Sequence, residues 1–417
     1  MRLTKIVDAM MWVLLTLALL RTTILVRRRD TSEFAEVDTS ATFAIFVVAS
    51  LLALLVIHPR GKAALMRMRE SSVMIFLIYL VYAAVSAAWS ENFQFTLFRA
   101  GEVLAVFGTL FVLMEGFTDW RKAERAMLIV LMLVTLLGVG QRIIIGDFSI
   151  AGLHTNLYSV TAGMGFLYTL AESLRADPAR KRRLRIWSGV FLFFAIIGTS
   201  AGSNIGIAVG MLVLLPFLSH SKVILIPAGL GCLGVIAIMG TSEELVSTTL
   251  LSGRSLEEAS TLTGRWSLWN AYWQAFLESP MVGRGFAIVA RLGDQFGTIA
   301  TTNAHNGFIE ALVGLGIIGF ITLLAYSVRL ILECIKASRS YVAGGLGVLV
   351  AMTMIMVNNN SKSILGGAYD PSVVGVFAML AFFHVFTLRA ARAKEAAAAS
   401  GQRTAPETAG RASALHS

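Results

Sequence analysis

Long apolar segments recur along most of the chain, and they constrain its fold more than any other feature. A helix needs about 20 mostly apolar residues to cross the roughly 30 Å hydrocarbon core of a bilayer, because each residue rises about 1.5 Å. About a dozen segments approach this length, at approximately 7–26, 42–57, 72–89, 98–114, 126–145, 157–174, 186–199, 205–218, 223–239, 307–332, 342–357 and 372–388. We therefore expect an all-α protein, a polytopic transmembrane bundle of about 12 helices.

The composition excludes a water-soluble fold of this length. Charged residues make up 14% of the chain and hydrophobic residues 56%, whereas soluble domains carry about 25% charged residues. Too little polar surface is available to cover the apolar segments in water, so the chain needs membrane lipids around it. The first apolar segment resembles a signal peptide, but it lacks a small-x-small cleavage site, and we treat it as a retained helix.

Basic residues gather in the short turns between apolar segments. The net charge of +10 would suit a nucleic-acid partner, but this distribution is typical of membrane orientation, and we expect no nucleic acid. With both termini in the cytoplasm, most basic residues fall on the cytoplasmic side. Arg27, Arg28 and Arg29 fall on the other side and contradict the rule locally. The basic turns on the cytoplasmic side lie near 60–69, 121–125, 175–185, 222 and 329–339, followed by the tail.

The chain divides into four parts. We expect an N-terminal transmembrane bundle of about nine helices at 1–239, a long periplasmic loop at 240–304, C-terminal transmembrane helices at 305–388 and a disordered cytoplasmic tail at 389–417. The tail is rich in Ala, Arg, Ser and Thr and has no apolar periodicity.

The loop at 240–304 is far longer than the other turns. Ordered loops of this length are usually functional. Aromatic residues within it recur at spacings of three and four, which places them on one side of a helix. We expect a partly helical loop that rests on the outer membrane surface. These residues are Trp266, Trp269, Tyr272, Trp273 and Phe276.

Several short motifs follow one another in and after this loop. They are TGRW at 263–266, PMVGRGF at 280–286 and NAHNG at 303–307, the last followed by GLGIIG at 314–319. With Trp89-Ser90 and the Gly-x-His-x-Asn at 152–156, this pattern resembles the O-antigen ligase and surface-polysaccharide polymerase superfamily, which includes exopolysaccharide polymerases. The resemblance covers roughly residues 86–319.

The resemblance implies an activity and its partners. Members of the superfamily are metal-independent glycosyltransferases of the bacterial inner membrane. They transfer a glycan from a polyprenyl pyrophosphate to a sugar hydroxyl at the periplasmic face. The acceptor is either a growing polysaccharide or a lipid A core, and other polysaccharide export components are an open further class of partner. No cofactor is implied, in keeping with the absence of a glycine-rich nucleotide motif and of an acidic metal motif from the sequence.

This reaction assigns different chemistry to arginine and histidine. A guanidinium stabilises a departing pyrophosphate because it is planar, permanently charged and bidentate, and a neutral imidazole can accept the proton of the acceptor hydroxyl. We predict Arg265 and His305 as the catalytic pair. The predicted substrate-binding residues are Arg284, Asn306, Glu310, Arg99 and His154.

Each of these residues also has a structural interpretation. His305 can cap a helix, Arg265 can anchor to lipid headgroups, and His154 can have a structural role. The tryptophans of the loop favour membrane anchoring over sugar stacking, and Gly314, Gly316 and Gly319 favour close helix packing.

The sequence leaves several functions open. A polymerase of exopolysaccharide or another surface glycan is our first hypothesis, an O-antigen ligase the second and a polysaccharide or lipid transporter the third; a non-catalytic assembly partner has no direct support. The chain also departs from the superfamily at 199–204, which reads TSAGSN where a Ser-Arg is often found. Whether a second arginine binds the pyrophosphate is therefore an open question, and Arg142, Arg284 and Arg291 are the candidates to replace the missing one.

Overall fold

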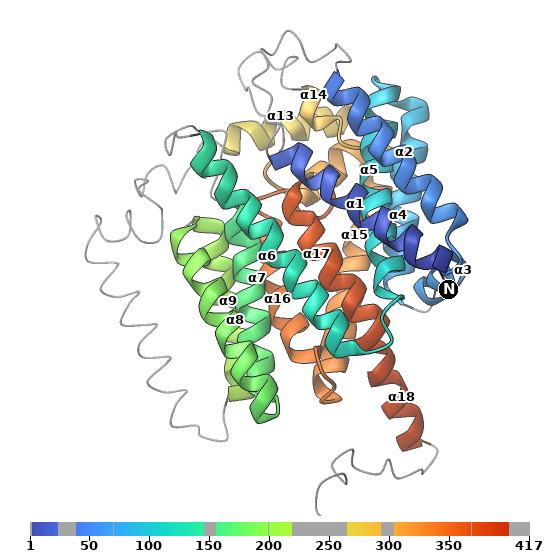
Figure 1. The fold of residues 1–417 in the computed structure, drawn as a ribbon. Helices are drawn as coiled ribbons and strands as arrows, with labels where there is room; N and C mark the ends of the chain where they lie inside the picture. The colour runs from blue at the N-terminus through green and yellow to red at the C-terminus, as the bar shows by residue number, and fades with distance from the viewer. Residues whose placement is uncertain are drawn as a thin grey trace, which may run out of the picture.

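The computed structural model describes residues 2–23, 39–69, 71–145, 156–198, 200–218, 265–292, 304–367 and 369–399. Within these ranges the chain is helical and contains no strand (Figure 1). The first group of helices is α1 (Arg2–Thr23), α2 (Thr39–Ile57), α3 (Gly61–Met68), α4 (Val73–Val85), η2 (Ser86–Trp89), α5 (Phe93–Met114), α6 (Trp120–Ile145), α7 (Asn156–Ser173), α8 (Pro178–Ile197) and α9 (Ala201–Leu218). The second group is α13 (Arg265–Glu278), α14 (Val289–Leu292), α15 (Gly307–Arg339), α16 (Gly345–Asn358), α17 (Pro371–Phe382), η5 (Phe383–Thr387) and α18 (Leu388–Ala399).

The helices confirm the polytopic, all-α fold predicted from hydropathy. Every predicted spanning segment coincides with a helix except 223–239, which lies outside the described residues. Five described helices are long and apolar enough to cross a membrane, or six if α2 and α3 form one span bent by 89°. Three shorter apolar helices accompany them, at Val73–Trp89, Gly202–Phe217 and Gly345–Asn358. The total of about twelve spans stays a prediction.

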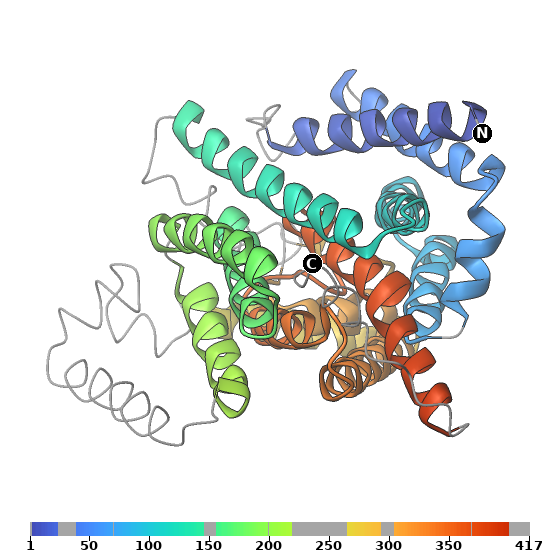
Figure 2. The same cartoon turned by 60° about the horizontal axis from the view of Figure 1, so that its bottom comes forward.

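The C-terminal helices occupy the centre of the bundle. Every residue of α17 is buried, and α17 packs against α5, α6 and α7. Helix α16 packs against α7, α9 and α15. Figure 2 shows α15 to α17 between the α1–α5 group on one side and the α8–α9 pair on the other. The chain therefore builds its core from segments distant in sequence.

The basic turns among the described residues lie toward one end of the bundle, where α18 lies and which we call the α18 end. Helix α13 crosses the opposite end, the α13 end (Figure 1). Contacts between turns distant in sequence support this placement. They include Arg175 Nη1 to Ser338 O (2.9 Å), Lys394 Nζ to Ser340 O (2.9 Å) and Arg121 Nη2 to Asp177 Oδ2 (3.7 Å). The turns that the charge pattern assigns to one side of a membrane are thus together in space.

The beginning of the tail corrects one prediction. We expected disorder from residue 389, but the chain remains helical through α18 to Ala399. Lys336 at the end of α15 lies 2.7 Å from Glu395 of α18, and Lys394 bonds to the α15 C-cap. The prediction of disorder rested on local composition alone. Composition cannot reveal contacts with a turn that lies more than 50 residues earlier in the chain.

Candidate functional site

Helix α13 confirms the helix predicted in the long loop, but its aromatic side faces the protein. Tyr272 and Phe276 are buried in an apolar cluster with Val313 of α15. Trp269 donates from Nε1 to the carbonyl oxygen of Ala304 at 2.9 Å. Trp273 is 49% exposed. Of the tryptophans whose side chains are described on α13, Trp273 is therefore the one still exposed enough for the predicted membrane anchor. Trp269 instead holds the chain next to His305.

His305 has a strained and well-anchored backbone. Its φ angle is 52°, in the left-handed region that non-glycine residues seldom adopt and that is common at functional sites. The residue before it, Ala304, donates its N–H to Glu310 at 3.0 Å and accepts the bond from Trp269. The residue after it, Asn306, is the N-cap of α15 and accepts from the backbone N–H groups of Phe308 and Ile309. Both neighbours of His305 are thus held by hydrogen bonds.

Glu310 and Asn306 organise the chain around His305. The Glu310 carboxylate, 4% exposed, accepts from Ala304 N–H and from the Ser363 hydroxyl at 2.6 Å. Asn306 uses its side-chain oxygen in the helix cap. These contacts place both residues beside the His305 backbone, and their predicted role in substrate binding stays a prediction. Whether they also set the tautomer of the imidazole stays a prediction.

The loop between α16 and α17 closes the site from the other side. Asn359 accepts a bond from Gly307 N–H through its carbonyl oxygen (2.9 Å). Its side-chain oxygen accepts from the N–H groups of Ile364 and Leu365. A Cβ atom on Gly307 would collide with Leu365 O and with the Asn359 side chain. Glycine at this position therefore allows α15 to begin directly against the loop.

Arg265 is the first residue of α13, and its side chain lies outside the described atoms. Trp269 stands four positions further along, which places the two residues on one face of the helix about 6 Å apart along its axis. Since Trp269 bonds to the residue before His305, the beginning of α13 and the beginning of α15 meet at the α13 end. The two predicted catalytic residues thus belong to neighbouring segments.

Helix α15 is broken at Gly316, where φ is 64° and ψ is −165°. The chain segment 280–285 fits into the break and satisfies the backbone groups that it frees. Arg284 and Gly285 donate their N–H groups to the carbonyls of Val313 (3.1 Å) and Gly314 (2.8 Å), while Ile317 donates to Pro280 O (2.9 Å). We call this arrangement the backbone interlock. Irregular backbone within a membrane protein is tolerated where it is buried and bonded in this way.

The interlock explains the glycines of two motifs. A Cβ atom on Gly283, whose φ is 69°, would collide with the backbone of Gly314, and one on Gly316 would collide with Met281. A Cβ atom on Gly285 would collide with the Ser90 side chain. The expectation that Gly314 and Gly316 serve helix–helix packing is therefore corrected: they serve contact between a broken helix and a loop.

Arg284 is the centre of an ion-pair cluster beside the interlock. Its guanidinium bonds to Glu91 before α5 (Nε to Oε1, 2.9 Å) and lies 3.1 Å from Glu278 at the end of α13. Trp89 of the same turn donates to Val282 O at 3.3 Å. Arg284 thus fastens α13 to the turn before α5, and a substrate anion would compete with two carboxylates for it.

The remaining predicted residues lie on another helix or outside the described residues. Arg99 lies on α5, 2.9 Å from Glu102, with its guanidinium over the rings of Phe95 and Phe98. His154 lies outside the described residues, as do the side chains of Arg142 and Arg291.

Sequence reasoning missed Lys362, which lies in the loop at 359–370. Its Nζ atom is 3.1 Å from Asp370 Oδ1 and from Ser372 Oγ, and its side chain is 12% exposed. The neighbouring Ser363 bonds to Glu310, and the other neighbour, Ser361, contacts Gly202 of α9. The only available signal was a lone lysine between two apolar segments on the predicted outer side.

The fold and the site define a polytopic membrane protein in which a surface helix and a broken helix position a histidine at one end of the bundle. Comparison with known proteins gives the class a name: residues 186–324 match the sequence model of the O-antigen ligase family. This range includes Arg265, Arg284, His305, Asn306, Glu310 and the interlock, but neither Arg99 nor His154.

A particular relative points in the same direction. A 74-residue stretch is 43% identical to the exopolysaccharide production protein ExoQ of Rhizobium meliloti (strain 1021), over 15% of this chain and 17% of the relative. The resemblance to the O-antigen ligase and polysaccharide polymerase superfamily is thereby confirmed, and the family match is confined to residues 186–324.

Proposed function

We propose that this protein is an inner-membrane glycosyltransferase that polymerises polyprenyl-pyrophosphate-linked oligosaccharide repeat units into exopolysaccharide or another surface polysaccharide. The observation that carries the proposal is the position of His305. Its left-handed backbone is held between α13 and α15, inside the segment that matches the O-antigen ligase family. Strain maintained by bonds on both sides is typical of a residue whose orientation matters for function.

In this proposal the α13 end faces the periplasm and the α18 end faces the cytoplasm. The gathering of the basic turns at the α18 end supports this orientation, because cytoplasmic turns are enriched in Lys and Arg. The N-terminal helix supports it too: Asp8 lies 2.5 Å from Arg60 of the basic turn after α2. Both termini are then cytoplasmic.

The reaction exchanges one glycosidic oxygen for another. The acceptor hydroxyl oxygen bonds to the anomeric carbon of the donor as the bond from that carbon to the pyrophosphate oxygen breaks. The hydroxyl proton passes to the neutral imidazole of His305. The pyrophosphate leaves with the bonding electrons, and Arg265 stabilises its charge. Lys362 adds a cation in the loop that packs on the beginning of α15.

Arg265→Lys tests the role of the guanidinium. A lysine keeps the charge but cannot hold two phosphate oxygens in a fixed fork, so transfer should fall by roughly 10- to 100-fold, the equivalent of one charge-assisted hydrogen bond. The variant should reach the membrane at normal levels. Transfer at the wild-type rate would remove Arg265 from the catalytic pair.

Two acceptors remain to be compared. The name of the relative, an exopolysaccharide production protein, favours a growing polysaccharide as the acceptor. The description of the matching family favours a ligase that transfers lipid-linked glycan to a lipid A core. We rank the polymerase first because the TGRW motif with a further tryptophan at position 269 resembles exopolysaccharide polymerases more closely.

Purified protein given a defined polyprenyl-pyrophosphate oligosaccharide tests the proposal. A polymerase converts the donor into a ladder of longer lipid-linked glycans without any other acceptor. A ligase gives product only when lipid A core is added. Neither product from well-folded protein, together with ion-coupled movement of the lipid across liposomes, would support a transporter instead.

A further inference from the structure

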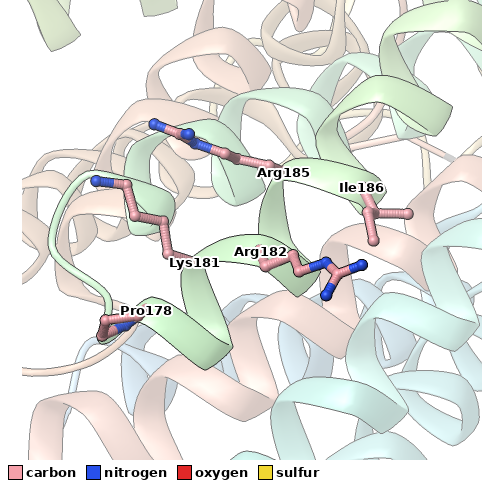
Figure 3. Close-up of a pocket in the computed structure, with 5 residues that line it drawn as sticks. All are labelled: Pro178, Lys181, Arg182, Arg185 and Ile186. Carbon is pink, nitrogen blue, oxygen red and sulfur yellow. The ribbon is translucent and has the colours of Figure 1, made fainter.

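The first turns of α8 orient their cations in two opposite directions. Arg180 points into the bundle, where its Nη2 atom lies 2.5 Å from Glu124 and 2.9 Å from Glu172. Lys181, Arg182 and Arg185 point away from it (Figure 3) and form no ion pair with a carboxylate among the described residues. Three unpaired cations on one face mark a site that can accept an anion from outside the protein.

These cations surround a hollow of about 430 Å³. Figure 3 shows Lys181 and Arg185 extending along one side of it and Arg182 along the other, near Ile186. Pro178 completes the lining, and the five residues follow the spacing of a single helix face, with no acidic residue among them. Lysine and arginine are the side chains that bind phosphate oxygens through charge-assisted hydrogen bonds.

An apolar stripe continues from the hollow along the same helix. Ile186, Val190, Phe193 and Ile197 are 60%, 39%, 58% and 49% exposed, and they recur every three or four residues. From residue 186 to residue 197 the stripe measures about 16 Å, close to half the thickness of a hydrocarbon core of about 30 Å. A ligand that fits both regions has an anionic head and a hydrocarbon tail one leaflet long.

We propose that the hollow and the stripe of α8 form a binding site for an anionic phospholipid. Its phosphate lies among Lys181, Arg182 and Arg185, and one acyl chain lies along the apolar stripe. The site lies at the α18 end, remote from α13 (Figure 1), and its occupancy is independent of the proposed glycosyltransferase activity.

The test uses full-length protein in detergent and measures binding of phosphatidylglycerol and phosphatidylcholine by native mass spectrometry. Wild type should retain phosphatidylglycerol preferentially. Lys181→Gln/Arg182→Gln/Arg185→Gln should weaken that binding on the order of 100-fold at low salt, since each cation near an anionic lipid contributes about 5-fold. Arg180 is left in place, so the buried ion pairs that hold α8 are preserved.

A matched control distinguishes a built site from general basic charge. Lys122→Gln/Arg125→Gln/Arg339→Gln removes three exposed cations from the same end and should change retention by less than about 5-fold. Equal losses in the two triple variants would overturn the site, as would an absence of preference in wild type.

Two further measurements identify the lipid as the source of the phosphate. Phe193→Gln/Ile197→Gln keeps every cation and should still reduce retention, because the acyl chain loses its contact. Unchanged retention in this variant, or complete displacement of the lipid by millimolar inorganic phosphate, would indicate a phosphate site without an acyl-chain groove. If the basic triple variant folds poorly, Arg182→Gln alone should give about a 5-fold loss, and no loss would contradict the proposal.

Discussion

The two ends of the bundle bury different interactions, although an exposed ion-pair cluster around Arg284 also joins segments at the α13 end. At the α18 end, charged side chains join the helices: Arg180 bonds to Glu124 of α6 and Glu172 of α7, and Glu172 also accepts from Gly344 N–H at 2.9 Å. At the α13 end, backbone groups join a broken helix to segment 280–285. Side-chain pairs resist separation but leave the backbone regular, whereas the interlock fixes irregular backbone and therefore the direction of nearby side chains. We infer that the contacts at the α18 end mainly hold the helices together, and that those at the α13 end mainly position the side chains of the site.

His305→Ala should give the largest effect and confine it to activity. Loss of a general base lowers transfer by roughly 10²–10⁴-fold, while membrane levels and Tm should stay near those of wild type, because Ala304 and Asn306 keep their bonds. The transfer rate is measured with purified protein, and Tm is measured by thermal unfolding in the same detergent. His305→Asn is a suitable companion because asparagine tolerates the left-handed backbone.

A structural role for His305 predicts the reverse result. The alanine variant would then be lost from the membrane, and the protein that remained would transfer glycan at the normal rate. That outcome would show that His305, like Arg180, stabilises the fold. The proposed difference in role between the two ends would then no longer hold.

Arg180→Met should affect stability instead. Removing the arginine leaves buried Glu172 without a cation and buried Glu124 with only the longer pair to Arg183 at 3.5 Å. This change should cost about 3–5 kcal/mol and should appear as a lower Tm and lower membrane abundance. The triple variant Glu124→Gln/Arg180→Met/Glu172→Gln removes the charges together and should recover most of the loss. If Arg180→Met instead reduced the transfer rate of normally stable protein, the assignment of cohesion to the α18 end would be wrong.

Sequence predicted the helices better than their junctions. A helix that crosses a bilayer needs a run of apolar residues of a certain length, and such a run can be recognised in the local sequence. Helices α5, α6 and α15 could be predicted for that reason. The break at Gly316 was not, because a Gly-x-Gly pattern fits close helix packing equally well. The pairing of Arg284 with Glu91 spans 193 residues, and no local pattern encodes such a contact. Lys362 was missed for the same reason.

Gly283→Ala tests the interlock with a smaller change. The new methyl group would meet the backbone of Gly314 at a position where φ is already positive, at a cost of about 1–3 kcal/mol. Transfer should fall with stability, because displacement of segment 280–285 also displaces α13. Gly140→Ala is the matched control: nothing lies within 4 Å of its Cβ position on α6, and helix propensity predicts a gain of up to about 1 kcal/mol. Equal Tm values for the two variants would show that the interlock contributes no stability.

Asp177 should give the smallest effect and reveal what kind of bond holds the beginning of α8. It is the N-cap of that helix and accepts a hydrogen bond from Arg180 N–H at 3.0 Å, and this bond lowers the pKa of the Asp177 carboxyl below its ordinary value of 3.8. A depressed pKa in the folded state means that the stabilisation is present above the ordinary value and is lost as pH falls through the folded value. The Tm difference between wild type and Asp177→Ala should therefore be constant from pH 7 to pH 5 and shrink below about pH 3.8. Because a backbone bond outweighs the exposed pair with Arg121, Arg121→Gln should leave Tm unchanged and added salt should not reduce the Asp177 effect. A difference that disappears in high salt at pH 7 would show that charge, and not the helix cap, fixes this turn, and would extend the ionic character of the α18 end to its solvent-exposed surface.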